Sequence, residues 1–444
     1  MTPVVFALLA ALAPPPELAA LSDLAQSAPA DVAAAALLRL AADSRFPDEI
    51  RPALLEQAFE KAAAAREPRP WRMMPRRAAV EAATYRAMGY ELGLDKLTLQ
   101  SRAVAALARV QPVRARRLFE QIVFPEVAPL TCADTLWPAV DPYFHAAGAV
   151  ANNAFSAAER RKEAHVAFLD SILGRVTSPV ALAPAMRLLQ EATLTESQRE
   201  TLTSRLLAMM ETVNGDDRSF SSSVQSAGEA FTRWNEASAL PVWRAYLLRH
   251  LKQARCRDTV DVETQVGQIV RAQAQLFGVD SDAKPERVLE APVDPASIEA
   301  PEWSALRDHY RALLTDSARG TPAWKIRVDA YLAAVEQMPV AAGGPAATFD
   351  RKIALFSSAV YLLGDGPERA RALVRLAGLL TSDPLQNEQP AVWLALADQV
   401  MRSSVTQSPS AHTSLLDALI ATGHPTLALW ARLERLMPGG SFPQ

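Results

Sequence analysis

Residues 31–65 read DVAAAALLRLAADSRFPDEIRPALLEQAFEKAAAA, and their pattern is typical of paired helices. Alanine and leucine fill two runs, and both residues favour helix because they lose little conformational freedom there. Residues 43–47 (DSRFP) interrupt the pattern, and Pro52 opens the second run, where its fixed backbone angle suits the first turn of a helix. The stretch therefore predicts a helical hairpin, with Asp31 as the N-cap of its first helix.

Pairs of amphipathic helices recur along the chain. In PVRARRLFEQI (112–122), the apolar residues fall at i, i+3, i+4 and i+7, which is the spacing of one helix face (Ala115, Leu118, Phe119 and Ile122). Three helix openings share the pattern Pro-x-x-Ala, at Pro112, Pro367 and Pro425. Proline suits the first helical position, and an alanine one turn later lets the preceding helix approach closely. Such units bury their apolar faces against their neighbours, so the sequence predicts an all-α, solenoid-like array of helical hairpins.

This degenerate pattern is similar to that of tetratricopeptide-like and other α/α repeats. The helix openings are unevenly spaced, however, and the Trp, Gly, Tyr and Pro signature of tetratricopeptide repeats does not recur with a period of ~34 residues. The resemblance therefore implies a fold class and an extended surface for protein segments, and it assigns the chain to no named family.

Proline-rich seams divide the chain. Residues 280–302 hold four prolines among acidic and small residues, which is the composition of an extended linker (Pro285, Pro292, Pro295 and Pro301). We therefore expect an N-terminal helical-repeat array at 21–279 and a C-terminal helical domain at 303–444. An earlier proline-rich seam, residues 125–145, is expected to be a long structured loop. The polar stretch NGDDRSFSSSVQSAG (214–228) is expected to be a further loop.

The first residues, MTPVVFALLAALAPPPELAA, suggest export. The apolar run from Val4 to Ala13 is about half the ~20 residues that a membrane-spanning helix needs, so we expect no membrane span. Its length suits a secretory signal peptide, with cleavage after the small-x-small pattern that ends at Ala13 or, alternatively, after Ala20. Because no Lys or Arg precedes the run, a first helix of a cytoplasmic protein remains the other interpretation. We expect residues 1–20 to be a signal peptide and the protein to be periplasmic or secreted, and otherwise cytoplasmic.

The composition argues against several classes of protein. The chain has 444 residues, 50% hydrophobic and 21% charged, which is ordinary for a folded protein. A formal net charge of -3 gives no field for phosphate backbones, so no nucleic-acid partner is expected, and the arginines at 72–77 and 114–117 are interpreted as solvated helix faces. The six histidines and two cysteines show no metal-binding spacing, and no nucleotide-binding motif is present, so we expect no metal and no cofactor.

Residues with chemical potential gather in the seam at 125–145. Cys132 could be a nucleophile beside Asp141 and His145, whose i, i+4 spacing suits an acid–base pair, and this alternative is an envelope hydrolase with its cleft at residues 125–145. The same residues are also explained by a helix cap at Asp141, an ordinary helical His145, and a disulfide between Cys132 and Cys256 in an oxidising compartment.

Three aromatic residues of the same seam could form a binding surface. Trp137, Tyr143 and Phe144 offer a grip for a peptide or a sugar ring, or they anchor the loop to the body of the protein. The function that we expect is a non-catalytic interaction or scaffold protein of the cell envelope, because stacked helical pairs present a long surface for protein segments. Its partner would be another protein, with self-association as an open alternative.

Overall fold

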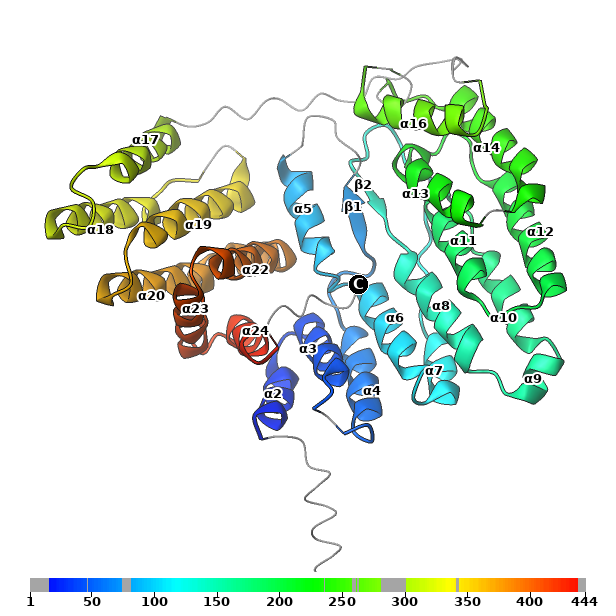
Figure 1. Cartoon of the computed structure of the whole chain (residues 1–444), viewed down its shortest axis with the longest axis horizontal. Helices are drawn as coiled ribbons and strands as arrows, with labels where there is room; N and C mark the ends of the chain where they lie inside the picture. Colours follow the sequence, from blue (N-terminus) through cyan, green and yellow to red (C-terminus); the bar gives the residue numbers. More distant parts are fainter. Residues whose placement is uncertain are drawn as a thin grey trace, which may run out of the picture. The chain divides into compact units, whose positions relative to one another are not determined.

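The computed structural model describes residues 16–45, 47–73, 81–234, 236–257, 261, 263–280, 301–340 and 343–437 (Figure 1). These residues are all-α, as the sequence predicts, apart from one two-stranded antiparallel sheet. Most of the expected signal peptide at 1–20 and nearly all of the expected linker at 280–302 lie outside the described residues. No helix in the described ranges is both long enough and apolar enough to cross a bilayer.

The helices form two compact units. Unit 1 comprises Met1–Pro47, Glu81–Gly93 and Pro295–Gln444, and unit 2 comprises Asp48–Val80 and Leu94–Asp294. This division differs from the expected one between 21–279 and 303–444, because the first helices of the chain pack with the last ones. Such packing joins segments that are far apart in the sequence and leaves no local sequence signal.

Unit 2 is a stack of helices in two layers. In the first layer each helix packs on the next, in the order α4 (Arg51–Ala62), α6 (Lys96–Leu107), α8 (Asp141–Asn153), α11 (Leu182–Glu191), α13 (Ser219–Trp234) and α16 (Gln265–Leu276). The second layer consists of α7 (Pro112–Phe119), α9 (Ala157–Arg161), α10 (Ala164–Leu173), α12 (Glu196–Thr212) and α14 (Leu240–Gln253). Short 3₁₀ turns, η1 (Pro179–Ala181) and η2 (Ala237–Ala239), precede α11 and α14. The strands β1 (Trp71–Met73) and β2 (Leu136–Pro138) pair antiparallel, with Trp71 opposite Pro138.

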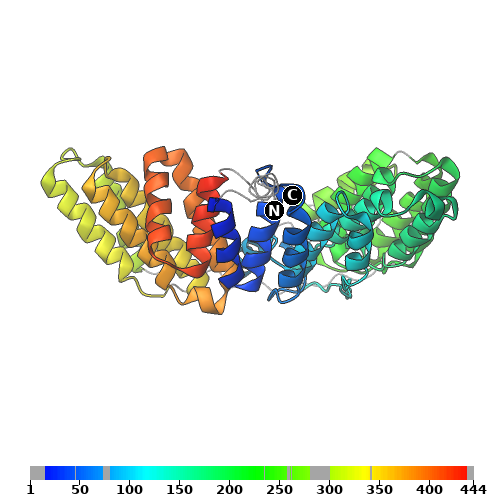
Figure 2. The same cartoon turned by 90° about the horizontal axis from the view of Figure 1, so that it is seen from below.

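Unit 1 has the same two-layer arrangement. Its first layer is α17 (Pro301–Thr315), α19 (Gly344–Leu362), α22 (Pro390–Gln407) and α5 (Glu81–Glu91). Its second layer is α18 (Pro322–Glu336), α20 (Pro367–Ser382), α23 (Pro409–Ala421), α24 (Pro425–Leu436), α2 (Pro16–Ser27) and α3 (Ala30–Ala42), with the short α21 (Leu385–Glu388) before α22. Figure 2 shows the helices from α17 to α24 side by side, coloured yellow to red. Each helix buries its apolar stripe against its neighbours, which is how the sequence pattern becomes a core.

Two contacts within unit 1 explain why early and late helices pack together. A Cβ atom added at Gly89 of α5 would lie 3.0 Å from the backbone of Ala391 in α22, so a larger residue would push the two helices apart by a few tenths of an ångström. Arg39 of α3 is 6% exposed and donates hydrogen bonds to Glu434 Oε2 at 3.0 Å and to the carbonyl of Met437 at 2.7 Å. A charged hydrogen bond in a buried position joins the N-terminal helices to the end of α24.

Helix starts follow the sequence where proline sets them. Pro112, Pro367 and Pro425 each begin a helix, as predicted. The predicted N-cap at Asp31 is wrong, because Pro29 is the extended residue before α3 and the Asp31 carboxylate accepts from the Val32 amide inside the first turn.

The expected loop at 214–228 is also wrong over most of its length. Helix α13 begins at Ser219, and its apolar residues form a buried stripe at helical spacing (Phe220, Val224, Ala227 and Phe231). The serines fit the helix because their hydroxyls donate to carbonyls of the preceding turn, as Ser221 does to Arg218 at 2.7 Å and Ser223 to Ser219 at 2.8 Å. The serine-rich composition had suggested a turn, whereas the apolar period of the same residues determines the structure.

Candidate functional site

The residues singled out in the seam at 125–145 are held by separate partners. Cys132 forms a disulfide with Cys256, so its sulfur is not a free thiol. The Asp141 carboxylate binds Arg187, and its other oxygen lies 3.4 Å from a guanidinium nitrogen of Arg72.

His145 belongs to a different contact. Its Nδ1 lies 3.9 Å from Glu191 Oε2, and its side chain is 63% exposed. The structure therefore does not bring Asp141 and His145 together as an acid–base pair. Asp141 is also not the cap of α8, because Val140 is the residue that precedes the helix.

The expected aromatic surface is wrong as a binding surface, because its members lie in the core of unit 2. Trp137, Tyr143 and Phe144 are 7%, 2% and 1% exposed. The Tyr143 ring lies 4.9 Å from Phe119 and 4.8 Å from Phe124 between centroids, and burial raises the pKa of its hydroxyl to about 12. These side chains anchor the seam to the body of unit 2, which was the other interpretation of the sequence.

A buried polar network fastens the same seam to the start of α13. Asp217 is 3% exposed and accepts from the amide of Leu130 at 3.0 Å and from the hydroxyl of Ser178 at 3.0 Å. Arg218 donates to the carbonyls of Cys132 and Asp134. Asp217 and Arg218 both bond to residues of the seam, so this network holds the seam in place.

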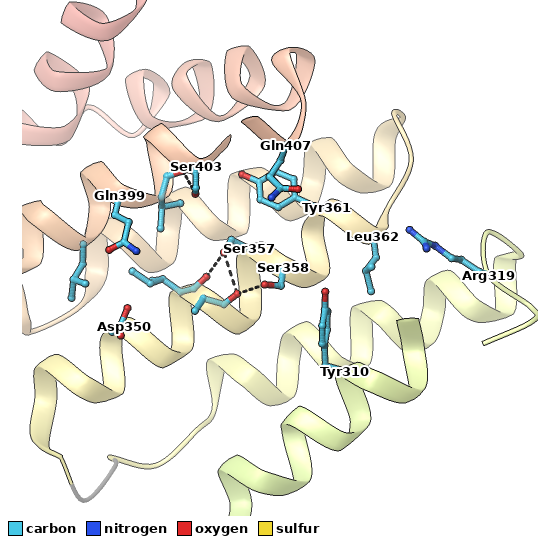
Figure 3. Close-up of a pocket in the computed structure, with 14 residues that line it drawn as sticks. Tyr310, Arg319, Asp350, Ser357, Ser358, Tyr361, Leu362, Gln399, Ser403 and Gln407 are labelled. Atoms are coloured by element: carbon cyan, nitrogen blue, oxygen red, sulfur yellow. Dashed lines mark hydrogen bonds between the residues drawn. The ribbon is translucent and has the colours of Figure 1, made fainter. Parts of the chain in front are cut away.

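The site that stands out is a groove in unit 1, which the sequence did not reveal. It has a volume of about 450 Å³ and is lined by residues of α17, α19 and α22 together with Arg319 (Figure 3). Its floor contains the apolar side chains of Ile353, Leu396 and Val400. We call it the α19–α22 groove.

One wall of the α19–α22 groove is a polar row on α22. Gln399, Ser403 and Gln407 are all exposed and follow each other at i, i+4 and i+8. At ~1.5 Å of rise per residue, neighbours in this row are ~6 Å apart along the helix. Figure 3 shows the three side chains in line along one edge of the groove.

The facing wall is a second polar row on α19. Ser357 donates to the carbonyl of Ile353 at 2.6 Å, and Ser358 donates to the carbonyl of Ala354 at 2.7 Å. Ser357 is buried, whereas Ser358 is half-buried, and its oxygen lone pairs face the groove because its hydrogen is used within the helix. Tyr361 follows one turn later on the same helix.

The two ends of the groove differ in charge. At one end, the Asp350 carboxylate accepts a hydrogen bond from the Tyr85 hydroxyl at 2.8 Å. At the other end, the exposed Arg319 side chain has no hydrogen bond or ion pair with any described residue (Figure 3). Burial raises the pKa of the Tyr361 hydroxyl, and Ser404 and Arg369 oppose this effect.

A serine–histidine contact joins α22 and α23. The hydroxyl of Ser404 is 2.8 Å from His412 Nδ1, but Ser404 is 0% exposed and also bonds the carbonyl of Met401 at 2.5 Å. A nucleophile must reach its substrate, so this buried pair is structural. Across the described ranges, no group of three His, Cys, Asp or Glu side chains is placed to hold a metal ion.

In comparisons with protein-family models, curated proteins and solved structures, no match was found.

Proposed function

We propose that this chain is a non-catalytic interaction protein of the cell envelope that holds segments of other proteins in the α19–α22 groove. The observation that carries the proposal is the pair of polar rows on facing helices above an apolar floor. Binding sites for flexible ligands typically combine an apolar base with a few converging polar groups. The helical hairpins are inferred to form an α-solenoid, an architecture that offers such surfaces to protein segments.

The chemistry of the walls favours a peptide. Glutamine side chains both donate and accept hydrogen bonds, and a peptide backbone carries one donor and one acceptor at nearly every residue. Gln399 and Gln407 can therefore pair with a backbone whatever its side chains are. A groove that binds the peptide backbone in this way suits an adaptor that accepts segments of several different sequences.

Two features support the placement in the cell envelope. The apolar run at residues 4–13 has the length of a signal-peptide core. The bonded pair of Cys132 and Cys256 is typical of compartments where disulfides persist.

The fold also bears on where a signal peptide would be cut. Leu18 is 1% exposed, in the first turns of α2, which packs on α3 and α24. Cleavage after Ala20 would remove this side chain from the core of unit 1, whereas cleavage after Ala13 leaves α2 whole. We predict that the intact mass of protein from its native envelope fraction corresponds to a chain that begins at Pro14. A chain that begins at Leu21, or a full-length chain in the cytosol, would contradict this prediction.

The binding proposal is tested by plugging the groove. Ala354 lines the groove and is exposed, so Ala354→Trp fills the groove from its wall without entering the core. Ala333→Trp is the matched control, because Ala333 is an exposed alanine of α18 that does not line the groove. A displayed library of random nonapeptides is selected on the full-length protein. The selected peptides should bind the Ala333→Trp protein and not the Ala354→Trp protein, and equal binding to both would refute the proposal.

The alternative of an envelope hydrolase with its cleft at residues 125–145 receives no support from the contacts there. It needs a free thiol at Cys132 and a pairing of Asp141 with His145, and these residues have other partners. The alternative of self-association predicts a molecular mass that rises with protein concentration. A mass that stays monomeric over a wide concentration range would exclude it.

A further inference from the structure

We infer that the α19–α22 groove takes its ligand as an extended peptide, held through its backbone, with an acidic side chain at the Arg319 end. The inference rests on the proposed function of the groove and adds the conformation and charge of the ligand. Three observations support it: the spacing of the polar rows, the hydrogen-bond donors and acceptors in them, and the Arg319 side chain, which has no partner among the described residues.

The spacing of the polar rows matches an extended chain. From Gln399 to Gln407, two steps of four residues cover ~12 Å of helix. An extended peptide rises ~3.3 Å per residue, so its backbone groups repeat on one edge every ~6.6 Å and four residues cover ~13 Å. The distance between neighbouring side chains of the row therefore matches the two-residue repeat of an extended ligand.

The donors and acceptors of the two walls complement the two edges of such a chain. The carboxamides of Gln399 and Gln407 can bond both the carbonyl and the amide along one edge. On the other edge, the half-buried Ser358 oxygen can accept from an amide, since its hydrogen is already donated within α19.

An α-helical ligand fits the same groove poorly. A helix satisfies its own backbone and binds through a broad apolar face, as in helix-in-groove recognition. Here Gln399, Ser403 and Gln407 make one wall polar, and the apolar lining consists of a few scattered side chains and no continuous face (Ile353, Ala354, Leu362, Leu396 and Val400). An extended chain can place one small apolar side chain on the floor while its backbone meets the walls.

The positive charge of Arg319 at one end of the groove fixes the orientation of the bound peptide. Two arginines close to Arg319 in the chain pair with carboxylates, Arg311 with Asp308 and Arg327 with Asp316. Arg319 has no such partner among the described residues, although its side chain lies at the mouth of the groove. Because this end is exposed, a chain can continue past Arg319, so the matching carboxylate is assigned to an acidic side chain.

The conformation of the ligand is tested with a peptide selected on the full-length protein, synthesised with a fluorescent label. A version with an i, i+4 lactam staple is fixed as a helix, and its binding is measured by fluorescence anisotropy. We expect stapling to abolish binding, because a helix cannot present its backbone to the two rows. Equal or tighter binding of the stapled peptide would overturn the extended conformation.

Backbone recognition is tested by replacing single amides of the peptide with esters, which removes one N–H each. We expect about a fivefold loss of affinity at amides within the groove, which is the size of one hydrogen bond. Gln399→Leu should weaken binding by a similar factor, while Gln337→Leu, at an exposed glutamine after α18, should not. Ester peptides that all bind as tightly as the parent would overturn recognition through the backbone.

The role of Arg319 is tested by a double substitution. Replacing the acidic residue of the peptide by its amide should weaken binding to the wild-type protein by about fivefold, the order of one partly exposed ion pair. In Arg319→Gln this difference should vanish, and in the control Arg432→Gln, at an exposed arginine of α24, it should persist. If Arg319→Gln keeps the difference, the charge assignment is wrong. If blocking the terminal carboxylate of the peptide produces the effect instead, the chain end is the ligand group.

These outcomes separate the two proposals. If no selected peptide distinguishes Ala354→Trp from Ala333→Trp, the groove is not the binding site and the proposed function fails. If Ala354→Trp blocks binding but the stapled peptide binds well, the proposed function stands and the extended conformation is refuted.

Discussion

His250 provides the sharpest quantitative prediction from the structure of unit 2. Its imidazole is 0% exposed, stacks on Phe220 at 4.2 Å between ring centroids, and meets the edge of Tyr246 at 4.4 Å. Burial lowers the pKa of His250 from 6.5 to about 3, the charge of Arg249 adds to this effect, and the backbone of Gly215 opposes it.

The direction of the pH effect on stability follows from the protonation of His250 in the folded and in the unfolded chain. Between pH 6.5 and 3, the unfolded chain binds a proton at His250 and the folded chain does not, so acid favours unfolding. The stability is fully present above pH 6.5 and is lost as the pH falls. Integrated from pH 7 to pH 4.5, the loss attributable to this one residue is about 2.5 kcal/mol.

The perturbation is His250→Phe, which keeps an aromatic ring in the stack and removes the titrating group. Urea unfolding is followed by tryptophan fluorescence at pH 7 and pH 4.5 for both proteins, since Trp243 lies 5.2 Å from Tyr246 between ring centroids and reports on this region. The free energy of unfolding should fall by about 2.5 kcal/mol more in the wild type than in the variant over this range.

Comparing the loss of unfolding free energy in the wild type with that in His250→Phe cancels the contributions of all other titrating groups. Asp95 has the opposite effect on stability, because burial raises its pKa from 3.8 to about 6. As the pH falls from 6 to 3.8, the folded protein binds a proton at Asp95 that the unfolded chain does not, so the folded state becomes more stable. Asp95 is present in both proteins, so its effect cancels. If the wild type and His250→Phe lose the same stability on acidification, His250 is not a buried neutral residue and the packing of α13 on α14 is wrong.

Further predictions concern the Cys132–Cys256 disulfide and the contacts between helices. The Cys132→Ser, Cys256→Ser double variant should lose up to about 5 kcal/mol of stability, because the bond closes a sequence separation of 124 residues, and reductant should then have no further effect on its denaturation midpoint. Gly89→Ala should lower the thermal midpoint by the equivalent of about 1–3 kcal/mol, because its Cβ would meet the backbone of Ala391 at 3.0 Å. Gly378→Ala, at an open site on α20, should instead raise stability by about 0.5–1 kcal/mol, and the opposite order of the two midpoints would contradict the placement of α5 on α22.

The elements that the sequence predicted well are those whose signals are local. Proline at the first helical position and apolar residues at 3.6-residue spacing located α7, α20 and α24, because both effects act within a few turns. The loop expected at 214–228 shows the limit of composition, since the serines there are compatible with a helix once Phe220 and Phe231 are buried.

The groove and the division into units could not be predicted, because both depend on contacts between distant segments. Gln399, Ser403 and Gln407 look in the sequence like any solvated helix face, and only the position of α19 opposite them makes them a wall. Likewise, nothing near Gly89 indicates that α5 packs on α22. The candidates at 125–145 were visible as residue types, but their partners Arg187 and Glu191 come from another helix.

The most direct measurement of the central claim is photo-crosslinking of a selected peptide to the full-length protein. The peptide carries a benzophenone amino acid at successive positions, and the crosslinked sites are mapped by mass spectrometry. We predict crosslinks in residues 350–362 of α19 and 396–407 of α22, which advance along both helices as the benzophenone moves along the peptide. Crosslinks that fall outside the α19–α22 groove would contradict this prediction.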